Sequence, residues 1–335
     1  MTHMVADFES GIHMSLNNTI VTVCTAGAIL SAGGVSGQDY PAKPVRMIAA
    51  EPGGGADVMA RLIGQGLTAS LGQQMVIENR GGASGAIAAE FVAKSPPDGY
   101  TILIYANVVW LLPLMRNNVP FDVFKDFAPI SLAASSPNVL VVHPALPVKS
   151  ISALIALAKS RPGELAFSTG GSGTTLHLCG ELFNALAGVK TLHVPYKSGG
   201  GALNGLVGGE VQLSFLVGAA ALPQIRSGRL RALAVTSSQP SELLPGLPTM
   251  ASAGLPGYSA DFTSGIFAPA ATPASVISRL NQEILTLLGK PDVKERFISV
   301  GVKAIGSSPE QLAATLKADA AKWSMVIRDA KIRAD

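Results

Sequence analysis

The stretch "AAEPGGGADVMARLIGQGL", residues 49–67, places three consecutive glycines between an apolar segment and a helical pattern. After the glycines, apolar side chains recur with the spacing of one helix face, at Val58, Met59, Leu62, Ile63 and Leu67. A helix start offers unpaired N–H groups and a partial positive charge, so this loop is a candidate anion site. It matches neither nucleotide motif. The Lys-Ser/Thr of a P-loop is missing, and Val58 stands where the dinucleotide fingerprint needs a small residue.

The order of strand, glycine loop and helix is found in both halves of the chain. In the first half "VRMIAA" leads to the triple glycine, "QMVIEN" leads to "RGGASGAIAAEFVA", and "YTILIYA" follows. The second half shows the same order in the segments "LAFSTGGSGTTLHLCGELFNAL", "TLHVPYKSGGGALNGLVGG" and "VQLSFLV". The interval from Gly53 to Gly81 is 28 residues, and so is the interval from Gly171 to Gly199. We interpret the two halves as equivalent α/β units.

The alternation of strands and helices predicts a mainly parallel sheet in each of two domains, with loops gathered at the carboxyl ends of the strands. Glycine loops from the two domains would then face one ligand cleft. The chain is expected to cross near "SSPNVLVVHPALP" and to return near "DFTSGIFAPAATP". These crossings predict a discontinuous first domain, residues 39–141 plus 265–335, and a second domain, residues 142–264. Helices are expected at 273–289, 291–299 and 309–330, the last opened by a capping box from Ser308 to Gln311.

Residues 1–37 resemble a secretory signal peptide. An apolar run, "IVTVCTAGAIL" at residues 20–30, is followed by small residues. The usual positive n-region is missing, since Asp7 and Glu9 stand there, and Met14 is an alternative start. No later apolar run reaches the roughly 18 residues of a spanning helix. We therefore expect a periplasmic, soluble and monomeric mature protein.

The composition favours a folded protein that binds a small anion. The 335 residues are 48% hydrophobic and 14% charged, which suits a well-buried core. Loss of the leader raises the formal net charge from +3 to +5, because the leader holds two acids and no Lys or Arg. No basic run is present and aromatic residues make up 5%, so nucleic acid is not an expected partner. Only Cys179 remains after the leader, which excludes an internal disulfide.

The sequence contains no catalytic or metal-binding motif. "GGSGT" has one residue between Gly171 and Gly173, so it does not form the G-x-S-x-G elbow of a serine hydrolase. Cys179 lies on the apolar face of its predicted helix and is expected to be inert. His143, His177 and His193 show no paired spacing for a metal. We expect no cofactor and no enzyme activity; an enzyme acting on a small carboxylate and a periplasmic sensor module are the alternatives.

Several motifs occur in one register from Tyr40 to the C-terminus, including "YPAKPVRMIAAEPGGGADVMARLIGQGL", "IENRGGASGAIAAEFVAKSPPDGYTILI" and "HVPYKSGGGALNGLVGGEV". In these motifs the chain resembles the Bug-type solute-binding proteins of tripartite tricarboxylate transporters. The resemblance implies a periplasmic two-domain protein of the Venus-flytrap type. Such a protein closes on a small carboxylate and delivers it to a two-component integral membrane permease.

The resemblance also implies which residues hold the carboxylate, mainly through main-chain N–H groups and small hydroxyls. No Arg lies inside these loops, so backbone dipoles would carry the recognition of charge. Asp57 has the alternative role of favouring its helix's first turn. His177, one turn into the next helix, either contacts the ligand or packs against a loop. The implied loops contain Pro52, Gly54, Gly55, Ala56 and Asp57; Gly82, Ala83, Ser84 and Gly85; and Ser168, Thr169, Gly170, Gly171, Ser172 and Thr174.

Departures from the family pattern suggest an apolar-bodied ligand. Gln212 and Leu216 stand where the family often has acids. The segment "VVW", residues 108–110, is expected near the cleft rim, although Trp110 is equally suited to a domain core. Together these residues favour an aromatic or medium-chain carboxylate. Glu51 beside the first glycine loop would weaken anion binding unless it points away or meets a donor on the ligand.

Overall fold

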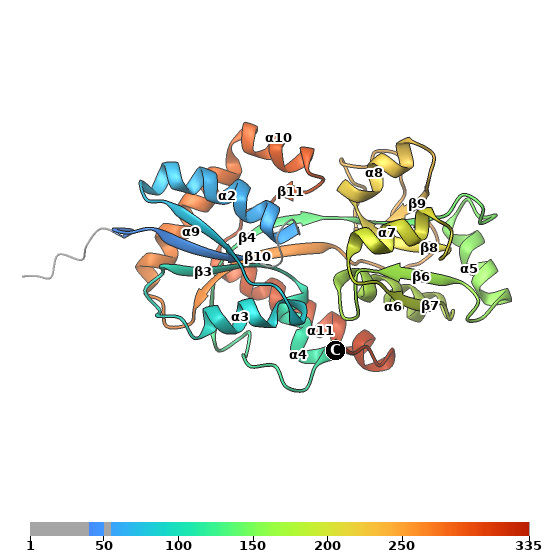
Figure 1. The fold of residues 1–335 in the computed structure, drawn as a ribbon, viewed down its shortest axis with the longest axis horizontal. Helices are drawn as coiled ribbons and strands as arrows, with labels where there is room; N and C mark the ends of the chain where they lie inside the picture. Colours follow the sequence, from blue (N-terminus) through green and yellow to red (C-terminus); the bar gives the residue numbers. More distant parts are fainter. Residues whose placement is uncertain (1–39, 50–54, 335) are drawn as a thin grey trace, which may run out of the picture. The chain divides into compact units, whose positions relative to one another are not determined.

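The structure is a computed structural model, and it describes residues 40–49 and 55–334. The predicted leader, Glu51, Pro52 and Gly54 therefore lie outside the described residues. The chain from Pro41 onward forms one compact unit built on two sheets. Figure 1 shows the two sheets with their covering helices.

The first sheet has six strands in the order β11-β4-β10-β3-β1-β2. Strand β1 runs parallel to both of its neighbours, β2 and β3. Strand β10 is antiparallel to β3 and β4, and β11 is antiparallel to β4. The strands are β1 (Val45–Ala49), β2 (Met75–Asn79), β3 (Thr101–Ala106), β4 (Phe127–Ser136), β10 (Phe262–Pro269) and β11 (Lys303–Ala304).

Helices cover both faces of the first sheet. On one face α2 packs against α9 and α10, and on the other α4 packs against α3 and α11 (Figure 1). The helices are α2 (Gly55–Leu71), α3 (Ala86–Ala93), α4 (Val108–Met115), α9 (Ala274–Gly289), α10 (Pro291–Ser299) and α11 (Pro309–Asp329). The three C-terminal helices fall where the sequence predicts them. The predicted capping box is present at the start of α11, where Ser308 and Gln311 bond each other's backbone N–H groups.

The second sheet has five strands in the order β7-β6-β8-β5-β9. Strand β6 is parallel to β7 and β8, whereas β5 is antiparallel to β8 and β9. The strands are β5 (Asn138–Val142), β6 (Ala166–Thr169), β7 (Leu192–Pro195), β8 (Leu213–Val217) and β9 (Arg231–Val235). The helices are α5 (Ile151–Ser160), α6 (Thr175–Ala187), α7 (Gly199–Val207) and α8 (Gly218–Arg226).

The repeat predicted from the sequence is present as a shared topology. Strands β2, β1 and β3 lie side by side in parallel, and β7, β6 and β8 repeat that order. The expectation of mainly parallel sheets needs a correction, because both sheets are mixed. In each, an antiparallel strand flanks the parallel trio: β10 beside β3, and β5 beside β8. These two strands come from outside the repeats, so the local strand-helix pattern gave no sign of their direction.

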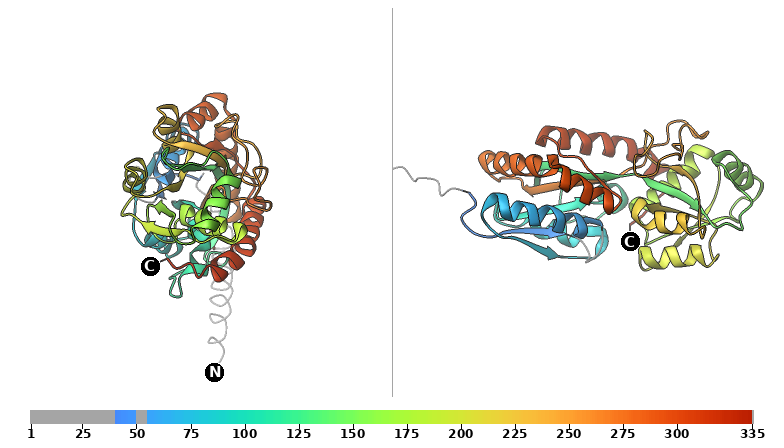
Figure 2. Two further views of the ribbon diagram at one scale, coloured as in Figure 1. Left: turned by 90° about the vertical axis from the view of Figure 1, so that its right-hand side faces the viewer. Right: turned by 90° about the horizontal axis from the view of Figure 1, so that it is seen from above.

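Two strand connections link the sheets. Strand β4 ends at Ser136 and β5 begins at Asn138, so Pro137 alone separates a strand of the first sheet from one of the second (Figure 2). The chain returns to the first sheet through Asp261, which directly precedes β10. By strand pairing, residues 138–142 belong to the second sheet and residues 262–269 to the first. We call the first sheet with its helices lobe 1 and the second sheet with its helices lobe 2; the exact domain boundaries stay a prediction.

The core continues from one lobe to the other on one side of the sheets. A single cluster of buried side chains includes Trp110 and Trp323 of lobe 1 and Leu140, Phe167 and Cys179 of lobe 2. Helix α11 packs against α4, β4 and α6 and so connects the two lobes. Among the described residues, no helix combines the length and apolarity needed to cross a bilayer.

Candidate functional site

The two predicted loops of lobe 1 emerge at the same edge of its sheet. Strands β1 and β2 are parallel and aligned so that Ala49 pairs with Asn79, the last residue of each strand. The loop after β1 leads into α2, whose first turn contains Ala56 and Asp57. The loop after β2 leads through Ala83–Gly85 into α3. The loops that lead to the two helix starts therefore leave the sheet from neighbouring strand ends.

Asp57 is buried in a polar network at the start of α2. Its side chain is 3% exposed. The Asn79 amide donates to Oδ1 of Asp57 at 2.8 Å, and Arg61 Nε donates to Oδ2 at 3.1 Å. Because both carboxylate oxygens have partners, Asp57 ties the start of α2 to the end of β2. This arrangement is the structural role that the sequence left open for it.

The second loop has a left-handed backbone over four consecutive residues. The φ angles are +106° at Gly82, +50° at Ala83, +56° at Ser84 and +91° at Gly85. Side chains disfavour this region, so Ala83 and Ser84 carry backbone strain of the kind that clusters at binding sites. Gly85 is required for a second reason, because a Cβ there would collide with the Tyr105 ring. The loop is thus held in one conformation by the end of β3.

Lobe 2 repeats this geometry with different side chains. Strands β6 and β7 are aligned so that Thr169 pairs with Pro195, again the last residue of each strand. A Cβ on Gly170 would lie 2.7 Å from the backbone N of Gly199, so the loop after β6 lies directly against the start of α7. Ser198 caps α7 by accepting the Gly201 N–H at 3.1 Å. The start of α7 was not among the predicted site residues, although the equal glycine spacing in the sequence pointed to it.

The predicted hydroxyls of lobe 2 are mostly used within the protein. Ser168 is fully buried and donates to the Ala202 carbonyl at 3.0 Å. Thr169 Oγ1 donates to the Gly171 carbonyl at 2.9 Å. Thr174 caps α6 by accepting the His177 N–H at 3.3 Å. These contacts use the three hydroxyls to fix the shape of the loop, and Thr169 Oγ1 also accepts the Gly171 N–H at 3.3 Å.

His177 is also used within the protein. Its side chain is 7% exposed, and Nδ1 accepts the Gly173 N–H at 3.0 Å. Its ring stacks on His193 with 3.8 Å between centroids. The structure therefore favours the packing interpretation of His177 over direct ligand contact.

The segment at residues 108–110 does not line a cleft, which corrects the sequence interpretation. Val108, Val109 and Trp110 are 9%, 2% and 2% exposed and belong to the core of lobe 1. Trp110 Nε1 donates to Asp319 at 3.1 Å, so α11 holds it inside. Leu216 is likewise a core residue, and Gln212 Oε1 accepts the Ala166 N–H at 2.9 Å. The sequence argument for an apolar-bodied ligand therefore loses its support.

Asn107, at the end of β3, is a site residue that the sequence did not indicate. Its Oδ1 accepts the Thr175 hydroxyl at 3.0 Å, and its amide donates to the Asp261 carbonyl at 3.0 Å. The first bond reaches the opening turn of α6 in lobe 2, and the second reaches the returning connection. One buried side chain thus links both lobes and the crossing between them.

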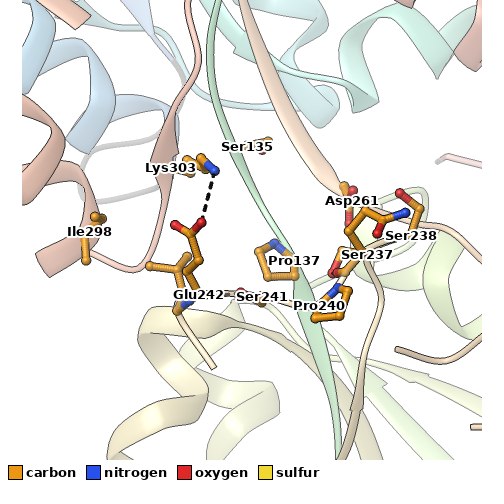
Figure 3. Close-up of a pocket in the computed structure, with 12 residues that line it drawn as sticks. Ser135, Pro137, Ser237, Ser238, Pro240, Ser241, Glu242, Asp261, Ile298 and Lys303 are labelled. Carbon is orange, nitrogen blue, oxygen red and sulfur yellow. Dashed lines mark hydrogen bonds and ion pairs between the residues drawn. The ribbon is translucent and has the colours of Figure 1, made fainter. Parts of the chain in front are cut away.

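A pocket of about 190 Å³ lies at the crossing between the lobes and is separate from the predicted loops. Ser135 and Pro137 form one wall, and Asp261 lies on another with Ser237 and Ser238 (Figure 3). Lys303 of lobe 1 and Glu242 of lobe 2 meet across it at 3.8 Å. Oδ1 of Asp261 is buried and finds no hydrogen-bond partner among residues 40–49 and 55–334, and burial raises the pKa of this carboxyl to about 6.

The described residues show no centre for covalent or metal chemistry. They contain no group of three His, Cys, Asp or Glu side chains arranged for a metal ion. Cys179 is fully buried, and burial raises the pKa of its thiol to about 12, which keeps it protonated and unreactive.

Comparisons with known proteins agree with the fold. The chain is 39% identical to protein BugT of Bordetella pertussis over 313 residues, which cover 92% of this chain and 95% of that protein. It matches the structure of Rpa4515 of R. palustris with adipate at a TM-score of 0.80 and 36% identity, covering 88% of this chain and 99% of that one. It matches MatC of Rhodopseudomonas palustris with bound malate at a TM-score of 0.76 and 29% identity, covering 86% and 100%.

The structure of the periplasmic binding protein BugD is similar at a TM-score of 0.77 and 31% identity, covering 88% of this chain and 99% of that one. The sequence model of the tripartite tricarboxylate transporter family receptor, TctC, matches residues 59–332. This family consists of binding proteins and not of enzymes. The chain belongs to the TctC family of solute-binding receptors, with the two-lobed α/β fold of periplasmic binding proteins.

Proposed function

We propose that this receptor captures a small aliphatic dicarboxylate between its two lobes in the periplasm. It then delivers the ligand to the two integral membrane components of a tripartite tricarboxylate-type permease. The observation that carries the proposal is the pair of matching loop edges. In each lobe two parallel strands end in register, and glycine-rich loops lead from them into helix starts.

The chemistry of these loops favours an anion with more than one carboxylate. The residues proposed to face it are Gly54, Gly55, Ala56, Ala83, Ser84 and Gly85 of lobe 1, and Gly170 to Thr174 with Ser198 to Gly200 of lobe 2. Helix starts and glycine loops offer N–H donors and positive dipole ends, which stabilise carboxylates. Because both lobes offer donors, a ligand with a carboxylate at each end can accept hydrogen bonds from each lobe.

The relatives support the dicarboxylate class and replace the apolar-bodied ligand considered from sequence. The similar structures contain adipate in one case and malate in another, and both are aliphatic dicarboxylates. In this chain Asp57 bonds to Asn79 at the end of β2, Ser168 bonds to the Ala202 carbonyl, and His177 accepts the Gly173 N–H. We propose these side chains as supports of the site and not as its main ligand contacts.

The available donors suffice for useful affinity. A hydrogen bond to a charged group contributes roughly 1.5 to 3 kcal/mol. About five such bonds, less the cost of ordering ligand and loops, support a free energy near −8 kcal/mol and a micromolar Kd. A ligand held by both lobes binds the closed form better than the open form, which is the condition for closure.

Isothermal titration calorimetry with adipate and malate tests the proposal. We expect micromolar binding of at least one of them by the unmodified protein and no binding by Gly55→Asp, which adds a negative charge where α2 begins. Gly289→Asp is the matched control, because it adds the same charge at an exposed position with no atom within 4 Å of the new Cβ. Unaltered affinity in Gly55→Asp would exclude the start of α2 from the site.

A further inference from the structure

Two imidazole rings lie face to face beneath the loop after β6. His177, in the first turn of α6, and His193, in β7, have ring centroids 3.8 Å apart and planes inclined by 13°. Phe167 packs beside both rings, with centroids 6.3 Å from His177 and 5.0 Å from His193. The rings therefore form a stack in which His177 is buried and His193 is half-buried, and the nitrogens at the ring edges contact other partners.

Each ring supports a different end of the loop. His177 Nδ1 accepts the Gly173 N–H at 3.0 Å, close to the start of α6. His193 Nε2 lies 2.7 Å from Thr169 Oγ1, at the end of β6. Thr169 Oγ1 in turn accepts the Gly171 N–H at 3.3 Å and donates to the Gly171 carbonyl at 2.9 Å. The stack thus fixes the loop at both ends.

We propose that His177 and His193 are a positioning pair that holds the loop from Thr169 to Thr174 in its ligand-binding shape and releases it at acidic pH. The inference rests on the proposed function, since it assigns the support and the regulation of that site. The pair contacts the loop and not the ligand.

The effect of protons follows from the atoms used. A neutral Nδ1 on His177 has a lone pair for the Gly173 N–H, and protonation there replaces the acceptor with a second donor. Two imidazolium rings at this spacing would also repel each other. The pKa of His193 is lowered to about 4, first by burial and then by the charge of His177, while Glu181 acts in the opposite direction. Glu181 faces the stack as a charged side chain, with Oε1 3.7 Å from His177 Nε2.

The pair can be tested with crossed amide substitutions. An Asn side chain places its oxygen close to the position of Nδ1 of a His, whereas a Gln side chain reaches the position of Nε2. His177→Asn keeps an acceptor for Gly173 and His177→Gln does not, while His193→Gln keeps a partner for Thr169 and His193→Asn does not. All four variants lose the ring stack equally, so differences between them report the hydrogen bonds.

At pH 7.5 we expect His177→Asn and His193→Gln, which keep their hydrogen bonds, to bind adipate or malate with Kd values within about threefold of each other. His177→Gln and His193→Asn, which lose those bonds, should bind about tenfold more weakly than these two variants, a difference of about 1.4 kcal/mol. The unmodified protein should lose affinity as the pH falls toward 4, and more steeply than His193→Gln, which has no ring to protonate there. Equal losses in His177→Asn and His177→Gln, or the same pH dependence in the unmodified protein and in His193→Gln, would overturn the proposal.

A ligand-free measurement separates this inference from the proposed function. Amide hydrogen exchange at Gly173 reports its bond to His177 whether or not a dicarboxylate binds. Exchange should be slow in the unmodified protein and in His177→Asn and at least about tenfold faster in His177→Gln. Slow exchange with no dicarboxylate binding would reject the proposed ligand and keep the positioning role. Equal exchange in the two variants would reject the positioning role alone.

Discussion

The hydroxyl of Thr175 donates a 3.0 Å hydrogen bond to Oδ1 of Asn107, and this bond joins lobe 2 to lobe 1. Both side chains are buried, with Asn107 2% and Thr175 8% exposed. The bond lies between the end of β3 and the first turn of α6, next to the loops proposed to hold the ligand. It therefore sets the relation between the two halves of the site.

Thr175→Val should destabilise the protein by about 1 to 3 kcal/mol, because it leaves the buried Oδ1 of Asn107 without its donor. Thr175→Ser keeps the hydroxyl and is the control, with a much smaller expected effect. Chemical denaturation of both variants, and of Asn107→Ala alone and combined with Thr175→Val, gives the coupling energy. A coupling below about 0.3 kcal/mol would show that the two residues act independently.

Gly85→Ala should be far more destabilising than Gly72→Ala. Both glycines have positive φ angles, +91° and +66°, so both variants carry backbone strain of about 1 kcal/mol or more. At Gly72 a new Cβ meets no atom within 4 Å, whereas at Gly85 it collides with Tyr105. Thermal melting should show a larger fall in Tm for Gly85→Ala, by the equivalent of at least about 1 kcal/mol. Equal melting temperatures would mean that Tyr105 moves aside freely.

Gly170→Ala should weaken dicarboxylate binding, whereas Gly289→Ala should not. A Cβ at Gly170 lies 2.7 Å from the backbone N of Gly199 and must push the loop away from α7. A Cβ at the exposed Gly289, at the end of α9, meets no atom of the described residues within 4 Å. We expect calorimetric titration to give at least about a tenfold higher Kd for the first variant and a change within about threefold for the second. Unchanged affinity in Gly170→Ala would separate these two loops from the site.

Asp261→Asn should stabilise the protein at neutral pH and not at acidic pH. Burial raises the pKa of Asp261 from 3.8 to about 6, so the folded state disfavours the ionised carboxylate. The folded state therefore binds more protons between these values, and stability falls as the pH rises through this window. The cost is absent below about pH 4, is complete above about pH 6, and amounts to at most about 3 kcal/mol.

The measurement is Tm as a function of pH for the unmodified protein and Asp261→Asn. The variant should melt a few degrees higher at pH 8, and the difference should vanish near pH 4. Asp98→Asn, at an exposed carboxylate paired with Lys43, is the control and should show no such trend. A constant difference at every pH would assign the effect to something other than the charge of Asp261.

Much of the repeated architecture could be predicted from sequence because it is encoded locally. The apolar spacing from Val58 to Leu67 specifies an amphipathic helix, and the box from Ser308 to Gln311 specifies where α11 begins. A parallel trio of strands follows from two successive strand-helix units, since right-handed crossovers allow few alternatives. For the same reason the glycine loops were expected at one sheet edge, where β1 and β2 and then β6 and β7 end together.

What the sequence missed depends on contacts between distant residues. The antiparallel strands β5 and β10 each join a sheet from outside its repeat, so their direction is decided by long-range pairing. The sequence left Trp110 open between a cleft rim and a domain core, and the structure decides for the core, because its indole reaches Asp319 on α11 and its ring is buried. The hydrophobic periodicity around residue 110 could not indicate that α11, from the far end of the chain, packs against this segment.

The sequence by itself determined where helices begin, where backbone turns need glycine, and which chain segments repeat. Those properties depend on side chains within a few residues of each other. Only the tertiary structure determined which hydrogen-bond partners the polar side chains around the loops have. His177 and His193 are 16 positions apart and meet only because α6 and β7 pack together. Burial then removed water as a partner, so each polar group took the nearest donor or acceptor that the fold supplied.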